Sequence, residues 1–228
     1  GKTWTNQSRL PEGFLGPVKN KPIQLANGDI LCGSSTEHNG WRVHFERLKY
    51  PPAFNLDWKM IGPIHDGRKI GAIQPSILQH KDGRLQAIGR SRENKIFTTE
   101  STDHGATWSE MSLLELPNPN SGTDAVTLAD GRHLLVYNHS AGKRTQWDYG
   151  RSVLNVAISD DGKTWKAALV LEKHDKGEYS YPAVIQSADG LAHITYTWQR
   201  KRIRHVTIDP AKLDLKPIVN GLWPTTQP

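Results

Sequence analysis

Polar and aromatic side chains stand directly before and after pairs of apolar runs at four places in the 228-residue chain. The positions before the first run of each pair are Lys21, Gln74, Asp124 and Tyr181. Positions after the second run include Arg90, Arg92, His139, Trp198 and Arg200. Arginine binds a carboxylate through two parallel hydrogen bonds and keeps its charge. If the fold brings these residues together, their types suit an anionic ligand.

The apolar runs belong to a repeat in which each pair is separated by a turn with glycine. The turn glycines are Gly28, Gly83, Gly131 and Gly190, which are 55, 48 and 59 residues apart. Asn-Gly and Asp-Gly at such turns are strong signals for β-hairpins. A period of this length fits one four-stranded blade of a β-propeller. The sequence therefore predicts an all-β chain, a single propeller domain of about four blades, with repeats near 1–60, 61–115, 116–170 and 171–228.

The predicted fold says where a ligand would bind. In a propeller, the start of each innermost strand and the end of the following strand line one axial opening, which we call the mouth. The residues before and after the apolar pairs would therefore gather at the mouth. Convergent polar groups in such an opening are the default place to look for a ligand site.

A second motif lies out of phase with the hairpins. Residues 101–108 fit the pattern S-x-D-x-G-x-T-W, residues 158–165 fit it with Ile158 in the first place, and residues 1–4 match its last four positions. In this pattern the Asp can cap turn amides, the Gly can take a positive φ, and the Trp can pack between sheets. We interpret the motif as a structural turn on the face opposite the mouth.

This motif resembles the Asp-box of the sialidase superfamily, and the resemblance covers the whole chain. It implies a β-propeller whose full-length form usually has six blades. We therefore expect the chain to be the C-terminal part of such a domain, without the early blades that carry the family's acid/base aspartate and first arginine. The resemblance also implies a secreted or periplasmic protein, with any signal region outside this sequence.

The resemblance extends to candidate site residues. The segment from Gln74-Pro75 to Arg90 is similar to a sialidase segment with Glu-Pro at a strand start and a carboxylate-binding arginine seven residues after the turn glycine. Arg151 matches a second such arginine, and Tyr181 matches the nucleophilic tyrosine, nine residues before its turn glycine. The family has Glu where this chain has Gln74, and a glutamine amide cannot take a proton.

The resemblance implies a sialidase-like exo-glycoside hydrolase that acts on terminal acidic sugars of the sialic-acid type. A tyrosine nucleophile avoids bringing a second anion against the substrate carboxylate. Asp124 or Glu178 would have to help activate Tyr181 in place of Gln74. The further substrate contacts are predicted to be Lys21, Arg92, His139, Trp198 and Arg200.

Two other functions suit the same residues. A propeller-fold lyase could cleave uronate-containing polysaccharide, with Tyr181 or His139 as the base and the arginines neutralising the carboxylate. A non-catalytic carbohydrate-binding propeller is compatible with a neutral Gln74. We expect an enzyme, and the residues alone leave these alternatives open.

Composition narrows the partners. The net charge of +6 and the pI near 9.4 suit an anionic partner. Cys32 is the single cysteine, so no internal disulfide can form.

We expect no metal or cofactor, because the sequence has no close cluster of metal-ligating residues and no phosphate-binding glycine loop. No apolar run approaches the ~20 residues of a membrane span, and the basic run 199–205 has too few aromatics to suggest nucleic acid. The expected partner is an acidic glycan, and the sequence does not indicate an oligomeric state.

Overall fold

The computed structural model describes residues 2–4, 9–50, 57–141 and 150–225. These residues form strands β1–β16 and one short 3-10 helix, Pro210–Lys212. In the described part of the chain, no helix has the length and apolar character that crossing a membrane requires. Gly1, which begins the partial third copy of the Asp-box, lies outside the described residues, and the Trp4 side chain of that copy is exposed.

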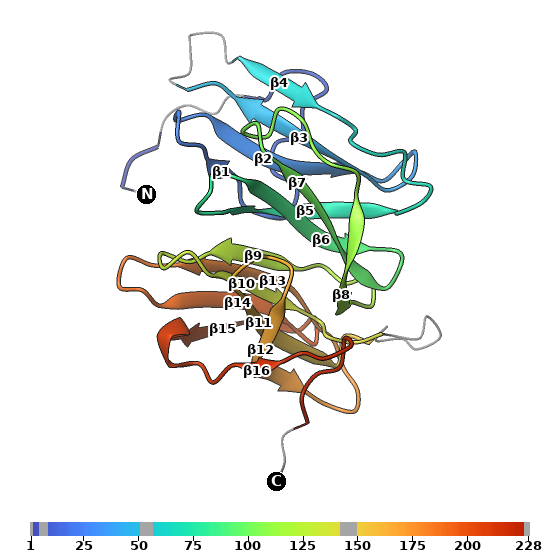
Figure 1. The fold of residues 1–228 in the computed structure, drawn as a ribbon, viewed down its shortest axis with the longest axis vertical. Helices are drawn as coiled ribbons and strands as arrows, with labels where there is room; N and C mark the ends of the chain where they lie inside the picture. The colour runs from blue at the N-terminus through green and yellow to red at the C-terminus, as the bar shows by residue number, and fades with distance from the viewer. Residues whose placement is uncertain (1, 5–8, 51–56, 142–149, 226–228) are drawn as a thin grey trace.

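The described strands form four antiparallel sheets that follow one another along the chain (Figure 1). The first sheet contains β1 (Ile23–Gln24), β2 (Ile30–Thr36), β3 (Arg42–Leu48) and β4 (Trp58–Ile61). The second contains β5 (Ala72–Gln79), β6 (Leu85–Ser91), β7 (Lys95–Ser101) and β8 (Ser112–Pro117). The third contains β9 (Asp124–Thr127), β10 (His133–Tyr137), β11 (Val153–Ser159) and β12 (Trp165–Lys173). The fourth contains β13 (Tyr179–Gln186), β14 (Ala192–Trp198) and β15 (Arg202–Ile208).

This arrangement confirms the predicted all-β propeller fold with about four blades. Two sheets depart from the predicted four strands. A short strand near the C-terminus, β16 (Lys216–Pro217), pairs with β12 as a fifth strand of the third sheet. The fourth sheet has three strands in the described part of the chain, so the outer side of β15 pairs with no described strand.

From the second sheet to the fourth, the first strands lie next to one another around the propeller axis, and the first sheet contacts them through its second strand. β5 contacts both β2 and β9, and β9 contacts β13. Figure 1 shows the chain passing from the blue first sheet through the green second sheet to the yellow and orange strands of the last two. The starts of β5, β9 and β13 are therefore brought together at one end of the molecule.

The hydrophobic core lies between neighbouring sheets, because successive side chains of a strand point to opposite faces. Ile77 belongs to the cluster between the first and second sheets, and Leu78 belongs to the cluster between the second and third. Leu135 also lies in that second cluster, whereas Leu134 lies in the cluster between the third and fourth sheets. Each middle sheet is thus buried on both faces.

The four predicted glycine turns are confirmed. The φ angles of Gly28, Gly83, Gly131 and Gly190 are 90°, 84°, 89° and 85°. Each of these glycines donates its backbone N–H to the carbonyl three residues earlier. A side chain at such a φ would be strained, which explains why glycine occupies all four turns.

The first Asp-box acts as a turn cap, as expected. The Asp103 carboxylate accepts hydrogen bonds from the backbone amide of Thr107 (2.9 Å), from the Thr107 hydroxyl and from the hydroxyl of Ser101 (2.8 Å). These bonds lower the pKa of Asp103 to about 2. The Trp108 ring stacks on Phe45 of the first sheet, with ring centroids 3.9 Å apart. The motif therefore joins two blades by packing.

The second Asp-box differs from its sequence alignment by one residue. The capping carboxylate belongs to Asp161, which accepts the amides of Lys163 (2.8 Å) and Thr164 (2.6 Å). Asp160, which the pattern aligns with the capping Asp, instead pairs with Lys166 at 3.0 Å. The shift arises because Ser159 takes the role of the leading serine, so this box has one residue fewer before its glycine.

Candidate functional site

Strand direction places most of the predicted site residues at one end of the sheets. The first strand of each sheet runs away from the mouth and the second strand returns to it. Gln74, Asp124 and Tyr181 therefore lie at the mouth, as do Arg90 near the end of β6 and Arg200 just after β14.

Two of these residues have an unusual backbone. Gln74 and Tyr181 have φ angles of 57° and 51°, and each precedes a proline. The strand register shifts at both places, between Ile73 and Ser76 and again between Ser180 and Ala183. Proline disfavours helical conformations in the residue before it, and such strain persists mainly where the surroundings enforce it, often at functional sites. In β5 and β13, these two bulges interrupt the alternation of side chains between the two faces of the sheet, at the end where a ligand would approach.

Arg90, Arg151 and Tyr181 form one cluster. The guanidinium carbon of Arg151 lies 5.7 Å from the centroid of the Tyr181 ring. The pKa of Arg90 is lowered, mainly by burial and further by the charge of Arg151. A hydrogen bond with Tyr181 acts in the opposite direction and raises the pKa. The Arg90 guanidinium also donates to the side-chain oxygens of Gln74 (3.3 Å) and Asn120 (3.1 Å). The structure therefore brings together the two arginines and the tyrosine.

Glu178 holds two arginines of the mouth. Its carboxylate accepts hydrogen bonds from Arg151 (2.8 Å), from Arg200 (2.6 Å) and from the hydroxyl of Ser180 (2.8 Å). Burial is the largest influence and would raise the pKa of Glu178, but the hydrogen bonds from Arg200, Ser180 and Arg151 together bring it below its ordinary value. Glu178 is thus a buried carboxylate that fixes the side chains of Arg151 and Arg200.

The buried carboxylate of Asp124 pairs with the partly exposed Lys21 and joins the inner strands. The Asp124 carboxylate accepts hydrogen bonds from the ammonium of Lys21 (2.9 Å), the hydroxyl of Ser76 (2.9 Å) and the amide of Val184 (2.8 Å). These donors come from three other segments at the mouth. The geometry gives Asp124 a clear role in joining the inner strands.

Lys19 is a mouth residue that sequence reasoning missed. Its ammonium donates to the carbonyls of Thr123 (2.7 Å) and Pro182 (3.0 Å) and to the side chain of Asn20 (2.9 Å). Burial lowers the pKa of Lys19 to about 8, against the opposing charge of Asp124. Only its closeness in sequence to Lys21 could have drawn attention to it.

Trp41, in the loop between β2 and β3, supports two arginines at the mouth. The guanidinium carbons of Arg90 and Arg92 lie 4.8 Å and 4.6 Å from the centroid of its ring. Cation–π contacts of this kind stabilise a charged group without neutralising it. Arg92 is exposed, so its charge extends the basic surface outward from Arg90.

His139 and Trp198, also predicted at the mouth, make other contacts. The His139 ring nitrogens bond to the Tyr137 hydroxyl and to the carbonyl of Gly221 (2.9 Å), and burial lowers the pKa of His139 to about 4. The Trp198 ring packs against Tyr179, with centroids 6.0 Å apart. Neither residue has a described contact with Arg90, Arg151 or Tyr181.

Buried polar atoms without a hydrogen-bond partner gather at the mouth end of the described strands. They belong to Ser34, Thr36, Arg42, Trp58, Asn118, Ser121, Thr123, Asn138 and Arg151. All of these except Trp58 lie where a strand starts or ends at the mouth. Buried polar groups are rarely left unpaired, so these atoms are donors and acceptors that face water or a ligand at the mouth.

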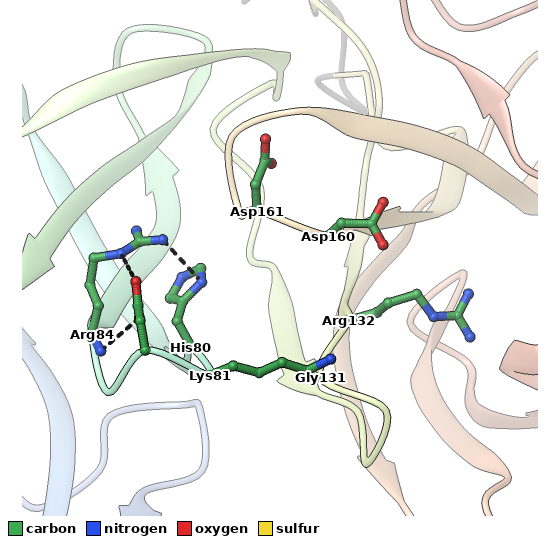
Figure 2. A pocket seen from close by; sticks show the side chains of 8 residues that line it. His80, Lys81, Arg84, Gly131, Arg132, Asp160 and Asp161 are labelled. Carbon is green, nitrogen blue, oxygen red and sulfur yellow. Dashed lines mark hydrogen bonds and ion pairs between the residues drawn. The ribbon is translucent and has the colours of Figure 1, made fainter.

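A separate pocket lies on the turn face, opposite the mouth (Figure 2). Both of its arginines are already paired, since Arg84 bonds to Glu100 at 2.7 Å and Arg132 pairs with Asp130 at 2.7 Å, which leaves Lys81 as its remaining lysine. Among the described residues, no group of three or more His, Cys, Asp or Glu side chains could hold a metal ion. The mouth is therefore the better candidate for a ligand site.

Comparison with known proteins agrees with this architecture. The family of BNR repeat-like domains matches residues 1–194. The sequence matches no curated protein. Similar solved structures include the NanB sialidase from Streptococcus pneumoniae, with 13% sequence identity and a TM-score of 0.64 over 85% of this chain. They also include an intramolecular trans-sialidase from Ruminococcus gnavus, with 18% identity and a TM-score of 0.64 over 86% of this chain.

A sialidase from Trypanosoma rangeli is similar over 81% of this chain, with 18% identity and a TM-score of 0.56. The chain spans only part of these proteins: 31% of the Streptococcus chain, 44% of the Ruminococcus chain and 30% of the Trypanosoma chain. At these identities the likeness concerns the fold.

Proposed function

Since the chain belongs to the family of BNR repeat-like domains, we propose that its mouth binds the carboxylate of a terminal acidic sugar of the sialic-acid type and that Tyr181 cleaves the glycosidic bond. The observation that carries the proposal is the position of Tyr181 between Arg90 and Arg151. Two guanidiniums next to one hydroxyl suit a sugar whose carboxylate lies beside its reacting carbon.

In the proposed reaction, Arg90 and Arg151 hold the substrate carboxylate while the Tyr181 oxygen attacks the anomeric carbon. The bond from that carbon to the leaving oxygen breaks, and the proton lost by the Tyr181 hydroxyl ends on the leaving alcohol. Water then hydrolyses the tyrosyl–sugar bond and restores the hydroxyl. The similar Ruminococcus trans-sialidase was solved with oseltamivir carboxylate, which also carries a carboxylate.

A second candidate is carbohydrate binding without cleavage. Two observations favour it: Gln74 accepts a hydrogen bond from Arg90 where a base would be wanted, and the carboxylate of Asp124 is already bonded to Lys21, Ser76 and Val184. The same arginines would then hold the sugar, and Tyr181 would contribute a ring and a hydroxyl.

One experiment separates these functions. The release of methylumbelliferone from 4-methylumbelliferyl α-N-acetylneuraminide measures hydrolysis, and calorimetric titration with N-acetylneuraminate measures binding. Hydrolysis that falls at least a hundredfold in Tyr181→Phe, with binding retained, supports cleavage by Tyr181. Tyr50→Phe is the matched control, because Tyr50 is exposed beyond the end of β3, far along the chain from the cluster.

Saturable binding without hydrolysis in the unaltered protein would favour the second candidate. Arg90→Ala should weaken that binding at least tenfold, whereas Arg132→Ala on the turn face should not change it. Absence of both binding and hydrolysis would overturn the proposal. A rise in ultraviolet absorbance with a uronate polymer would instead identify a lyase.

A further inference from the structure

A second pocket of the mouth lies next to Tyr181. The residues that line it are Glu178, Tyr181, Thr197, Arg200, Lys201, Arg202 and Ile203. Most of them come from the end of β14, the start of β15 and the turn between them. A ligand held at Tyr181 would therefore have this hairpin tip as its neighbour.

The hairpin tip is held in a strained form. Gln199 and Arg200 have φ angles of 51° and 53°, and the amide of Lys201 donates to the carbonyl of Trp198 (3.0 Å). Turns with positive φ at both central positions strongly favour Asn and Gly there. Here larger residues occupy both positions and use their side chains, because Gln199 bonds to the hydroxyl of Tyr179 (3.1 Å) and Arg200 to Glu178. The tip is thereby anchored, and the residues after it are presented in a fixed place.

The charges of this pocket are unbalanced. Glu178 is its single carboxylate, and it is already shared between Arg151 and Arg200. No described acidic side chain pairs with Lys201 or Arg202. The guanidinium carbon of Arg202 lies 4.1 Å from the Trp198 ring centroid, and an arginine stacked in this way keeps the donors at its edge for another partner. The pocket therefore offers two cations to an incoming anion.

We propose that this pocket is a second anion subsite, which binds the negatively charged group of the sugar next to the terminal one. The ligand would be the end of a polyanionic glycan, in which two adjoining sugars each carry a carboxylate. Arg90 and Arg151 would hold the first carboxylate, and Lys201 and Arg202 would hold the second. This inference rests on the proposed function, because it takes the terminal sugar to lie at Tyr181.

Calorimetric titration with matched ligands tests the subsite. One pair is N-acetylneuraminate and its α2,8-linked dimer, and the other is galacturonate and its α1,4-linked dimer. The two pairs separate sialic acids from uronates as the source of the carboxylates. In at least one pair the dimer should bind about five- to tenfold more tightly than the monomer, and about 0.5 M salt should reduce this difference because exposed charges are screened.

The double variant Lys201→Ala/Arg202→Ala should bind the monomer as the unaltered protein does and lose the extra affinity for the dimer. Lys163→Ala/Lys166→Ala is a control that removes the same charge on the turn face, away from the mouth. Equal affinity for monomer and dimer in both pairs would overturn the subsite and leave the proposed function standing. An advantage of the dimer that survives in the Lys201/Arg202 variant would also overturn it. If no monomer or dimer binds at all, both the subsite and the proposed function fail.

Discussion

Gly122 is the residue on which the position of Tyr181 depends most directly. A Cβ added at Gly122 would lie 2.9 Å from the Lys19 Cε and 3.2 Å from the Tyr181 ring. Both neighbours are held, Lys19 by the carbonyls of Thr123 and Pro182 and Tyr181 by its bulged backbone. The loop before β9 therefore reaches the tyrosine only because this position has no side chain.

Gly122→Ala should accordingly reduce binding or turnover of the acidic sugar at least tenfold, because a displacement of the Tyr181 ring by even ~1 Å misaligns the reacting groups. Thermal unfolding should show that the variant remains folded. Gly83→Ala is the matched control, since a Cβ there meets nothing within 4 Å and lies on the turn face. The Gly83→Ala variant should lose about 1 kcal/mol in free energy of unfolding, because alanine is strained at the positive φ of this position, and its binding should be unchanged. Unchanged binding in Gly122→Ala would show that the packing of Tyr181 does not matter.

Local patterns located part of the mouth and missed the rest. Arg90, Arg151 and Tyr181 could be proposed from the resemblance of their segments to sialidase segments, and the structure brings them together. Lys19 and its partners could not be found in this way, because its hydrogen bonds join residues far apart in sequence. The role of Glu178 depends on an arginine from another loop, which no period in the sequence reveals.

At the scale of elements, a hydrogen-bonded histidine pair joins the turn faces of the second and third sheets. His133 at the start of β10 lies 3.2 Å from His80, just after β5, and His80 lies 3.0 Å from Gln86. The Gln86 amide continues the connection to the carbonyl of Gly162 in the second Asp-box (2.9 Å). Burial, and then the neighbouring charges of His80 and Arg84, lower the pKa of His133 to about 4.

The free energy of unfolding should therefore fall as the pH decreases from about 6.5 to about 4. Above this range His133 is neutral in the folded and unfolded chains, whereas within it the unfolded chain binds a proton that the folded chain excludes. Each pH unit crossed costs at most about 1.4 kcal/mol for one such group. Because burial also lowers the pKa of His139 to about 4, part of the dependence should remain when His133 is replaced.

Denaturant unfolding at several pH values measures this dependence. His133→Gln should have a shallower slope than the unaltered protein between pH 6.5 and 4, whatever its stability at pH 7. His38→Gln, which replaces an exposed histidine, should keep the original slope. If the slope of unfolding free energy against pH is unchanged in His133→Gln, His133 does not contribute to the loss of stability in acid.

Elements were easier to predict than their exact alignment. The glycine turns and the Asp-boxes identified the sheets because they are local signals that repeat. The capping role of Asp161 in place of Asp160 was missed, since the two boxes differ by one residue in length. The fifth strand of the third sheet was missed too, because β16 is only two residues long and pairs with β12, some 50 residues earlier.

At the scale of the whole molecule, the outer edge of β15 is the most exposed surface for strand pairing. No described strand pairs with that edge, and Ile203 on it is 78% exposed. Arg202 and Arg204 stand on either side of Ile203. Charged residues on an edge strand oppose pairing with another chain, so their repulsion is expected to limit self-association.

Self-association should consequently increase with ionic strength, as salt screens the charges along β15. Sedimentation velocity at about 0.05 M and about 0.5 M salt would measure it. Ile203→Lys should reduce association at the higher salt concentration by at least severalfold. Lys69→Ala, which removes an exposed ion pair with Glu110 elsewhere on the surface, should have no effect. If association changes neither with salt nor with the Ile203 substitution, the contact between chains does not involve β15.

The bonds of Lys19 have a consequence for how the protein reaches its native state. Two of its acceptors, Thr123 and Pro182, lie 104 and 163 residues further along the chain. During synthesis the first blade would emerge long before these carbonyls exist, and contacts across such long loops form slowly. The mouth should then be completed late in folding, after the individual hairpins have formed. In a refolding experiment, sugar binding should return more slowly than the β-sheet signal in circular dichroism.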